Sequence, residues 1–371
     1  MKILVATVVV ALASSVSVAQ RRGEDFNDMK KSLDLPTGIC MSYIDAGKPT
    51  GTPVLLIHGY TDTSRSFQLL IEDLQQIDNE IRIIAPDLRG HGQSSMPDPC
   101  QCEEVPEQCF TQGQFSADIL ALLDQLEIQK THIVGHSMGS IIAQTLALEH
   151  PEHVFSMTLL GTFVNGKESP VIHDFLIRDL IEEDWKCTLE EERHVSWPQD
   201  AYSILPLNMG ERVMDYLKEN WVVEAGAAKE FLDAIFPETL RVPLGTWIGA
   251  IKSLGEIDYR GALQKLKIPT LILWGEQDAV TGPRDQEQVK SAFQAAAAAT
   301  GTKVIYKTYG ELPGVGYKLE PGHNFHWAAH KAVAEDISAF ISNRTVPGTT
   351  NDNNLSNSEG TLQKQDFVKL N

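Results

Sequence analysis

The stretch Gly135-His136-Ser137-Met138-Gly139 decides how the rest of this sequence is interpreted. It follows the apolar run 131–134, which predicts a short buried strand, and it precedes residues 140–148, which predict a helix. The glycines two positions before and two after Ser137 let the strand and the helix approach each other without a Cβ clash. A serine at such a turn is exposed above the sheet edge, beside free helix amides that can bind an oxyanion. The stretch therefore predicts a nucleophilic serine.

The overall composition suits a globular protein with a substantial core. The chain has 371 residues, of which 42% are hydrophobic and 22% are charged, so we expect one large domain or a domain with an insertion. The formal net charge of −19 argues against nucleic acid and anionic membrane surfaces as partners, because both are polyanions.

The N-terminus predicts export. Met1-Lys2 begins the chain, an apolar run covers residues 3–13, and Ser17-Val18-Ala19 supplies small residues at the −3 and −1 positions. We expect a signal peptide at residues 1–19 and a secreted or periplasmic protein; an uncleaved anchor is the alternative. No later segment reaches transmembrane length, so we expect no membrane span in the mature chain.

The cysteines favour a disulfide over a metal site. Three of the five lie within residues 97–109, which predict a polar loop insertion closed by at least one bridge. A zinc site is the alternative, but the usual paired C-x₂-C arrangement is absent, so we expect no metal. Five is an odd number, so at least one thiol is free or pairs outside the chain. The cysteines are Cys40, Cys100, Cys102, Cys109 and Cys187.

Short apolar runs alternate with amphipathic stretches along most of the chain. This alternation predicts an α/β fold, with a mostly parallel, doubly wound sheet covered by helices on both faces. The expected strands are 54–57, 81–85, 131–134, 155–160, 270–274 and 303–309, and the expected helices of this part include 115–126 and 327–341.

The alternation is interrupted between residues 164 and 267. This part contains helical segments such as 171–185 and 210–223 but no clear strand, so we expect a helical cap over the ligand-binding edge of the sheet. Residues 345–371 are rich in Asn, Ser, Thr and Gly and predict a disordered tail. Asn343 and Asn354 begin N-x-S/T sequons that could carry glycans in a eukaryotic host. The expected parts are a signal peptide (1–19), core (24–163), cap (164–267), core (268–344) and tail (345–371).

A serine hydroxyl needs a base, and the base needs an acid that holds it in one tautomer. Asp278 follows the expected strand 270–274 and is our predicted acid; Glu276 is the alternative, but the shorter aspartate side chain has a more defined reach. The stretch 161–165 contains no carboxylate and cannot supply the acid.

The predicted base is His323, which follows a glycine in the loop before the last helix. His326 is the alternative but is better suited to packing or capping, and His330 lies within the helix. For the oxyanion, the backbone amide of Met138 is one expected donor. The amide of Tyr60, in the turn after strand 54–57, is the second.

Together these pieces resemble the α/β-hydrolase fold superfamily, in its capped serine-hydrolase form. The resemblance covers roughly residues 53–341 and implies a cofactor-independent hydrolase in which Asp87 and His91 are structural. The cysteine-rich insertion and the long loop 309–320 depart from the family pattern. The matching motifs, in the family's order, are His58-Gly59-Tyr60, Asp87-Leu88-Arg89-Gly90-His91-Gly92-Gln93-Ser94, Gly135-His136-Ser137-Met138-Gly139, Gly275-Glu276-Gln277-Asp278 and Gly322-His323.

The identity of the nucleophile narrows the expected chemistry. Relatives that resemble epoxide hydrolases and haloalkane dehalogenases carry aspartate at this turn, whereas Ser137 fits acyl transfer. We expect a small-molecule ester or lactone substrate and, first, hydrolysis of a carboxylic ester. A lactonase or C–C bond hydrolase on the same triad and a slow-turnover ligand-binding protein are the alternatives. Trp185, Trp221 and Trp247 could form the walls of the cap or belong to the core.

Overall fold

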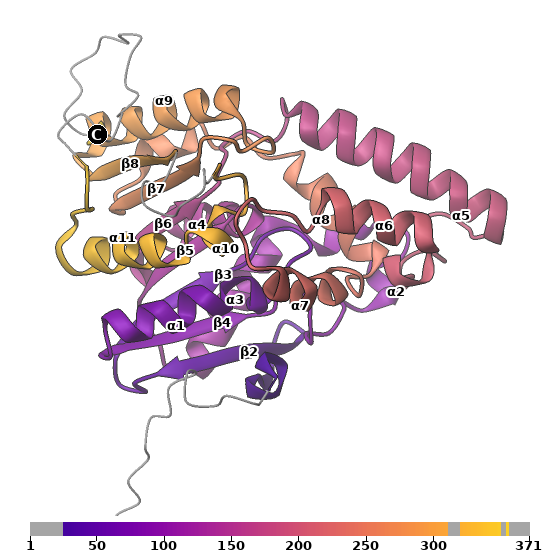
Figure 1. Cartoon of the computed structure of the whole chain (residues 1–371), viewed down its shortest axis with the longest axis horizontal. Coiled ribbons are helices and arrows are strands. Elements are labelled where there is room, and N and C mark those ends of the chain that lie inside the picture. Colours follow the sequence, from indigo (N-terminus) through magenta and orange to yellow (C-terminus); the bar gives the residue numbers. More distant parts are fainter. Residues whose placement is uncertain (1–24, 311–319, 350–353, 356–371) are drawn as a thin grey trace, which may run out of the picture.

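An eight-stranded β-sheet forms the centre of the molecule, in the order β1-β2-β4-β3-β5-β6-β7-β8 (Figure 1). The computed structural model describes residues 25–310, 320–349, 354 and 355; the expected signal peptide and most of the expected tail lie outside these residues. The strands are β1 (Lys31–Asp34), β2 (Cys40–Gly47), β3 (Thr52–Ile57), β4 (Ile81–Pro86), β5 (Thr131–His136), β6 (Val154–Leu160), β7 (Thr270–Gly275) and β8 (Val304–Tyr309).

The sheet is mostly parallel, which confirms the expected fold class. β4, β3, β5, β6, β7 and β8 pair in parallel and correspond to the six strands that the apolar runs predict. β1 and β2 pair antiparallel at one edge and were not predicted. β1 is mostly exposed, and β2 carries serine and aspartate among its apolar residues, so neither forms an apolar run.

Each face of the sheet contributes to a separate apolar core, because alternate strand residues point to opposite faces. Val54 and Leu56 of β3 pack in the core beneath α1 (Gln68–Ile77) and α11 (His330–Asn343). Leu55 and Ile57 pack in the core beneath α3 (Gln112–Gln125), α4 (Met138–Glu149) and α9 (Pro283–Thr300). The short α10 (Phe325–Ala328) precedes α11, so the last expected helix is divided in two.

The chain between β6 and β7 is helical, as expected for the cap, and its helices gather at one side of the sheet (Figure 1). They are a stretch of π-helix, η6 (Val171–Trp185), followed by α5 (Lys186–Arg193), α6 (Glu211–Asn220), α7 (Lys229–Thr239) and α8 (Leu244–Leu254), with short 3-10 turns at η7 (Pro206–Asn208) and η8 (Ala262–Lys265).

The insertion leaves and rejoins the core at one point. Asn165 and Asp258 form an isolated antiparallel bridge, the amide of Gly166 donates to the carbonyl of Ile257 at 2.9 Å, and Tyr259 donates to Val164 at 2.8 Å. η8 follows this closure and packs against α9 and α4. The insertion is therefore closed near residue 259, and the side chains of Leu263 and Leu266, which follow the closure, are buried.

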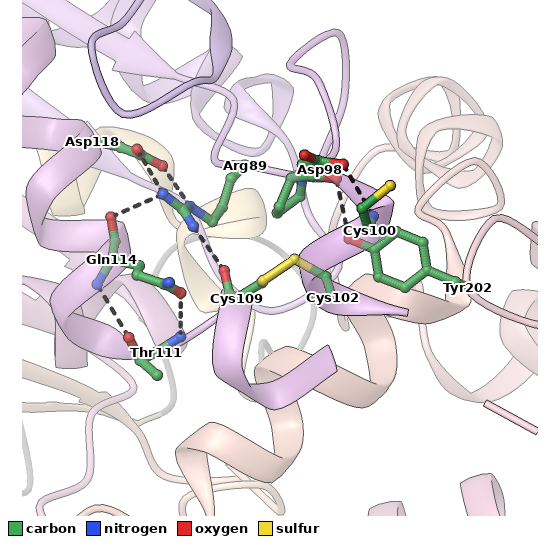
Figure 2. The surroundings of a disulfide bond; sticks show 10 residues. Arg89, Asp98, Cys100, Cys102, Cys109, Thr111, Gln114, Asp118 and Tyr202 are labelled. Atoms are coloured by element: carbon green, nitrogen blue, oxygen red, sulfur yellow. Dashed lines mark hydrogen bonds and ion pairs between the residues drawn. A yellow bond between two sulfur atoms is a disulfide. The ribbon is translucent and has the colours of Figure 1, made fainter. Parts of the chain in front are cut away.

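The cysteine-rich segment folds into two short turns, α2 (Pro99–Cys102) and η4 (Pro106–Cys109), and a disulfide joins Cys102 to Cys109 (Figure 2). Arg89 donates through Nη1 to the carbonyl of Cys109 at 2.8 Å and forms a buried, two-point ion pair with Asp118 of α3. These contacts attach the segment to the core. Cys40, Cys100 and Cys187 are exposed free thiols.

The beginning of the expected tail packs against the fold. Val346 and Leu355 are buried, and Asn354 forms a β-bridge with Ile305 of β8. Asn343 is the last residue of α11 and is exposed. Within the described residues, no helix has the length and apolar character needed to cross a membrane.

Candidate active site

Ser137 lies at a sharp turn between β5 and α4. Its φ of 50° and ψ of −119° are unusual for a residue with a side chain, and strain of this kind is concentrated at functional sites. The turn needs its glycines: a Cβ on Gly135 would lie 2.3 Å from the carbonyl oxygen of Gly139, and one on Gly139 would lie 2.1 Å from that of Ile57. The local geometry therefore matches the expected strand–serine–helix turn.

His323 bridges Ser137 and Asp278. Its Nε2 lies 2.8 Å from the Oγ of Ser137, and its Nδ1 lies 2.9 Å from the Oδ2 of Asp278. Because an ionised carboxylate only accepts hydrogen bonds, Nδ1–H donates to Asp278, and the Nε2 lone pair faces the serine hydroxyl. The structure thus brings together all three side chains predicted for the triad, from three loops at the same edge of the sheet.

Asp278 is buried, and both of its carboxylate oxygens accept hydrogen bonds. Its Oδ1 accepts from the amides of Val280 and Thr281, each at 2.8 Å, and its Oδ2 accepts from the Thr281 hydroxyl at 2.6 Å. The alternative acid, Glu276, is exposed. Of the two carboxylates, Asp278 is therefore the one placed to bond His323.

The electrostatics of the pair follow from this geometry. Burial acts to lower the pKa of His323, but the carboxylate of Asp278 outweighs it, with smaller contributions from Asp62 and Glu224, so the net pKa is raised. Burial acts to raise the pKa of Asp278, and His323 and Thr281 reverse this, so its net pKa is lowered. The pair therefore stabilises a positive imidazolium, which a general base needs once it has taken a proton.

The two expected oxyanion donors flank Ser137. Met138 is the first residue of α4, and Tyr60 follows β3, whose Ile57 is in register with Gly135 of β5. A Cβ on Gly59 would lie 3.2 Å from the Cβ of Ser137, so the turn holding Tyr60 lies directly against the serine. Among the described residues, neither amide donates a hydrogen bond, which leaves both available for a ligand oxygen.

The remaining histidines near the site have other partners. His136 Nε2 donates to the carbonyl of His323 at 3.1 Å, and burial with the neighbouring His326 lowers its pKa well below its ordinary value. His326 is buried against Phe67, its Nε2 lies 3.1 Å from the Oγ of Ser66, and burial lowers its pKa to about 3. His330 pairs with Asp73. None of the three contacts the serine hydroxyl.

Two acidic residues near His323 were not predicted. Asp62 follows the Tyr60 turn; its Oδ2 accepts from Ser66 and lies 3.8 Å from the Nδ1 of His136, and burial raises its pKa to about 7. Glu224 comes from the loop between α6 and α7, and burial raises its pKa to about 7 as well. Asp62 lies two residues after the motif His58-Gly59-Tyr60, whereas no local pattern marks Glu224.

Asp87 and His91 take up the structural positions that the sequence predicts for them. Asp87 is fully buried and accepts from Lys30 Nζ at 2.8 Å and from both the amide and the hydroxyl of Ser64. His91 is buried, and its Nδ1 donates to the carbonyl of Arg89 at 2.9 Å. Neither contacts Ser137, and both organise the turn after β4.

The aromatic residues connect the site to the insertion. The Tyr60 ring packs edge-on against Trp221 and Trp247, with centroid separations of 6.0 and 5.3 Å, and its hydroxyl donates to the carbonyl of Trp247 at 2.7 Å. Trp185 and Trp247 are fully buried and belong to the core, while Trp221 is half-buried beside Tyr60. Of the three tryptophans, only Trp221 has exposed surface beside the site.

The comparison with protein families agrees with this architecture. A family model described as alpha/beta hydrolase fold matches residues 52–186, from β3 through the serine turn to the end of η6. The chain has the α/β-hydrolase fold. Across the part of this α/β-hydrolase that the structure describes, no group of three or more His, Cys, Asp or Glu side chains could hold a metal ion.

Individual relatives within the superfamily are distant. The chain is 36% identical over 118 residues to a serine hydrolase-like protein of Danio rerio, a match that covers 32% of this chain and only 33% of the relative. It is 26% identical to Lipase 3 of Moraxella sp. (strain TA144), over 84% of each chain. The crystal structure of the enol-lactonase from Burkholderia xenovorans LB400 superposes with a TM-score of 0.60, at 16% identity, over 84% of this chain and all of that one. That likeness demonstrates the shared fold.

Proposed function

We propose that this α/β-hydrolase is a secreted serine hydrolase that cleaves a carboxylic ester through an acyl-enzyme. The observation that carries the proposal is the chain of hydrogen bonds from Ser137 Oγ through the His323 ring to Asp278, at 2.8 and 2.9 Å. A serine, a base and an acid in this order form a complete unit for activating a hydroxyl nucleophile.

In the first half-reaction, Nε2 of His323 removes the proton of Ser137 as its Oγ attacks the ester carbonyl. The amides of Tyr60 and Met138 donate to the oxyanion that forms. His323 then gives its proton to the departing alcohol, the C–O bond breaks, and the acyl group stays on Ser137. Asp278 keeps Nδ1 protonated throughout, which leaves Nε2 free to accept.

In the second half-reaction, His323 takes a proton from water, which attacks the acyl-enzyme and releases the carboxylic acid. The same two amides stabilise the second oxyanion, each contributing about 10²–10³ in rate by analogy with other oxyanion donors. His323 then gives the proton taken from water to the Oγ of Ser137 as the acyl–oxygen bond breaks, so the resting triad is restored and the cycle needs no cofactor.

The serine also separates this chemistry from hydrolysis through an alkyl-ester intermediate. Such a route uses a carboxylate nucleophile at the turn, whereas Ser137 offers a hydroxyl. Lactones and C–C bonds next to a carbonyl remain within reach of the same triad. A comparison of kcat/KM across linear esters and lactones decides between these substrates, and higher values for lactones overturn the ester assignment.

The direct test is Ser137→Ala with a short p-nitrophenyl ester. We expect turnover to fall by about 10⁴-fold or more while the thermal unfolding temperature stays close to that of the wild type. A fluorophosphonate should label Ser137 in the wild type and not in the variant. Retained turnover in Ser137→Ala contradicts the proposal, and a single stoichiometric burst in the wild type favours a ligand-binding protein.

Export is part of the proposal and rests on the N-terminal pattern. The basic start, the apolar run 3–13 and the small residues at 17 and 19 support cleavage after Ala19. N-terminal sequencing of protein recovered from the culture medium or periplasm tests it. A mature chain that begins at Gln20 is the expected result, and an intact Met1 in a membrane fraction contradicts it.

A further inference from the structure

The loop that joins α6 to α7 in the insertion reaches back to both sides of the proposed catalytic centre. Trp221 donates through Nε1 to the Oγ1 of Thr61 at 2.8 Å, next to the turn that holds Tyr60. Three residues later, Glu224 accepts a hydrogen bond from the amide of Gly322 at 2.8 Å and another from the amide of Asn324 at 3.0 Å. These two amides lie immediately before and after His323.

The backbone around His323 is held from three directions. The carbonyl of Pro321 accepts from the amide of Gln277 at 2.9 Å, and the carbonyl of His323 accepts from His136 Nε2 at 3.1 Å. The amides on either side of His323 both bind Glu224. The loop carrying His323 is therefore fixed by the acid loop, by the serine turn and by the insertion.

The contact with Glu224 is close and specific for a carboxylate. A Cβ on Gly322 would lie 3.0 Å from Oε2 of Glu224, so the glycine permits the approach. Oε1 binds one amide and Oε2 the other, and Glu224 is only 9% exposed. A carboxylate offers two acceptors, whereas glutamine in the same place would offer one acceptor and one donor. The side chain of Asn324 adds a bond from Nδ2 to the carbonyl of Val223 at 3.3 Å.

We propose that Glu224 is a positioning residue for His323, which it acts on by fixing the peptide units on both sides of that histidine. The inference rests on the proposed function, because it assigns His323 the role of base. Glu224 touches neither Ser137 nor Asp278 through a hydrogen bond; it keeps the imidazole in the plane where both can reach it. The insertion thereby contributes to the chemical step.

The test compares Glu224→Gln with the wild type on the p-nitrophenyl ester. The carboxamide can accept a hydrogen bond from only one of the two backbone amides, and its NH₂ group faces the N–H of the other. We therefore expect kcat to fall roughly ten- to hundredfold. KM should stay within about twofold, because Glu224 does not hold the substrate. Glu219→Gln, at an exposed position of α6, is the matched control and should leave both constants unchanged.

The pH profile of kcat/KM distinguishes an effect of Glu224 on His323 from a general effect on the stability of the fold. Asp278, Asp62 and Glu224 are the carboxylates that raise the pKa of His323, and the neighbouring His136 and His326 are neutral. Burial raises the pKa of Glu224 itself to about 7, so Glu224 and His323 both titrate in the acid limb of the wild type. Glu224→Gln removes the titration of Glu224 and the attraction of its ionised carboxylate for the imidazolium, so the acid limb of kcat/KM should move to lower pH. A variant that is merely less stable would keep the wild-type limb.

Glu224→Asp is the second variant. It keeps the charge but withdraws the carboxylate by one methylene, so it cannot reach both amides, and we expect kcat to fall while the acid limb moves less than in Glu224→Gln. Wild-type kcat in both variants, or a fall in kcat matched by an equal fall for Glu219→Gln, overturns the proposal. If neither variant folds, Glu224 is a folding determinant and the proposal is also overturned.

Fluorophosphonate labelling keeps this result distinct from failure of the proposed function. If the wild type is not labelled at Ser137 and turns over no ester, the serine-hydrolase assignment itself fails. If the wild type is labelled and the Glu224 variants are labelled at the wild-type rate, the triad stands and only the positioning role fails. The expected result is slower labelling in both variants, by a factor similar to the loss in kcat.

Discussion

Nδ1 of His323 donates to Oδ2 of Asp278 across 2.9 Å, while two amides and a hydroxyl already bind the same carboxylate. Asp278 therefore has little freedom to turn, and the imidazole that depends on it has one available orientation. The tautomer of His323 is set by this contact, and the proposed base strength of Nε2 follows from the tautomer.

Asp278→Asn should preserve the shape of the site but favour the wrong tautomer of His323. The new side chain can present an NH₂ group to the ring, which favours the tautomer with its proton on Nε2, and that tautomer cannot accept from Ser137. We expect kcat to fall by about 10⁴-fold, as for other triads of this kind. Steady-state kinetics on the p-nitrophenyl ester measure the effect. Glu276→Gln, at the exposed neighbouring carboxylate, should retain wild-type kcat; the opposite pattern would assign the acid to Glu276.

As the pH is lowered, the activity should be lost at a higher pH than the titration of an ordinary histidine would give. The base is active when neutral, and Asp278 raises the pKa of His323 above its usual 6.5. As the pH falls through this raised pKa, Nε2 becomes protonated and can no longer accept the serine proton. A profile of kcat/KM between about pH 5 and pH 9 reports the pKa in the free enzyme. An acid limb with its midpoint below 6.5 would contradict the pairing.

Removing the disulfide should destabilise the cysteine-rich segment without abolishing the chemistry. Cys102 and Cys109 are 7 residues apart in sequence. A bridge that closes so short a loop contributes roughly 2–3 kcal/mol to the free energy of unfolding in the chain-entropy description. Denaturant unfolding of the double variant Cys102→Ser/Cys109→Ser measures this difference.

Cys100→Ser is the control for this experiment, because Cys100 is an exposed free thiol in the same turn. It should unfold at the wild-type denaturant concentration. Peptide mapping without reduction should recover Cys102 linked to Cys109. A linkage that involves Cys100 instead would show that the pairing differs from the one described.

The parallel strands could be predicted from the sequence because apolar residues predominate in them and most of their residues are buried. β1 escaped prediction because it is the edge strand and is mostly exposed. β2 lies between β1 and β4 and is mostly buried, but Ser42 and Asp45 interrupt its apolar residues. η8 lies within the residues expected to form the insertion, but it follows the bridge at Asp258 and packs against α9 and α4, a contact between segments distant in sequence.

The members of the proposed triad could be named from the sequence by their order along the chain and by the strands that precede them. Glu224 could not be predicted, because its hydrogen bond to the amide of Gly322 joins residues 98 positions apart. A buried glutamate in a helical region has no distinctive local pattern. Its partners are backbone amides, which carry no signature in the sequence. Such a contact becomes visible only when the two loops are placed side by side.

The two ends of the insertion meet at the bridge between Asn165 and Asp258, so residues 166–257 could be exchanged as one segment, here called a cassette. A cassette from another protein could be joined there without changing the register of any strand in the sheet. The transplant would nevertheless remove the carboxylate that holds Gly322 and Asn324. Altering substrate preference by swapping this region therefore requires that the incoming segment carry an equivalent acceptor. An exchange chosen only for the shape of the binding surface would leave the histidine loop without one of its three supports.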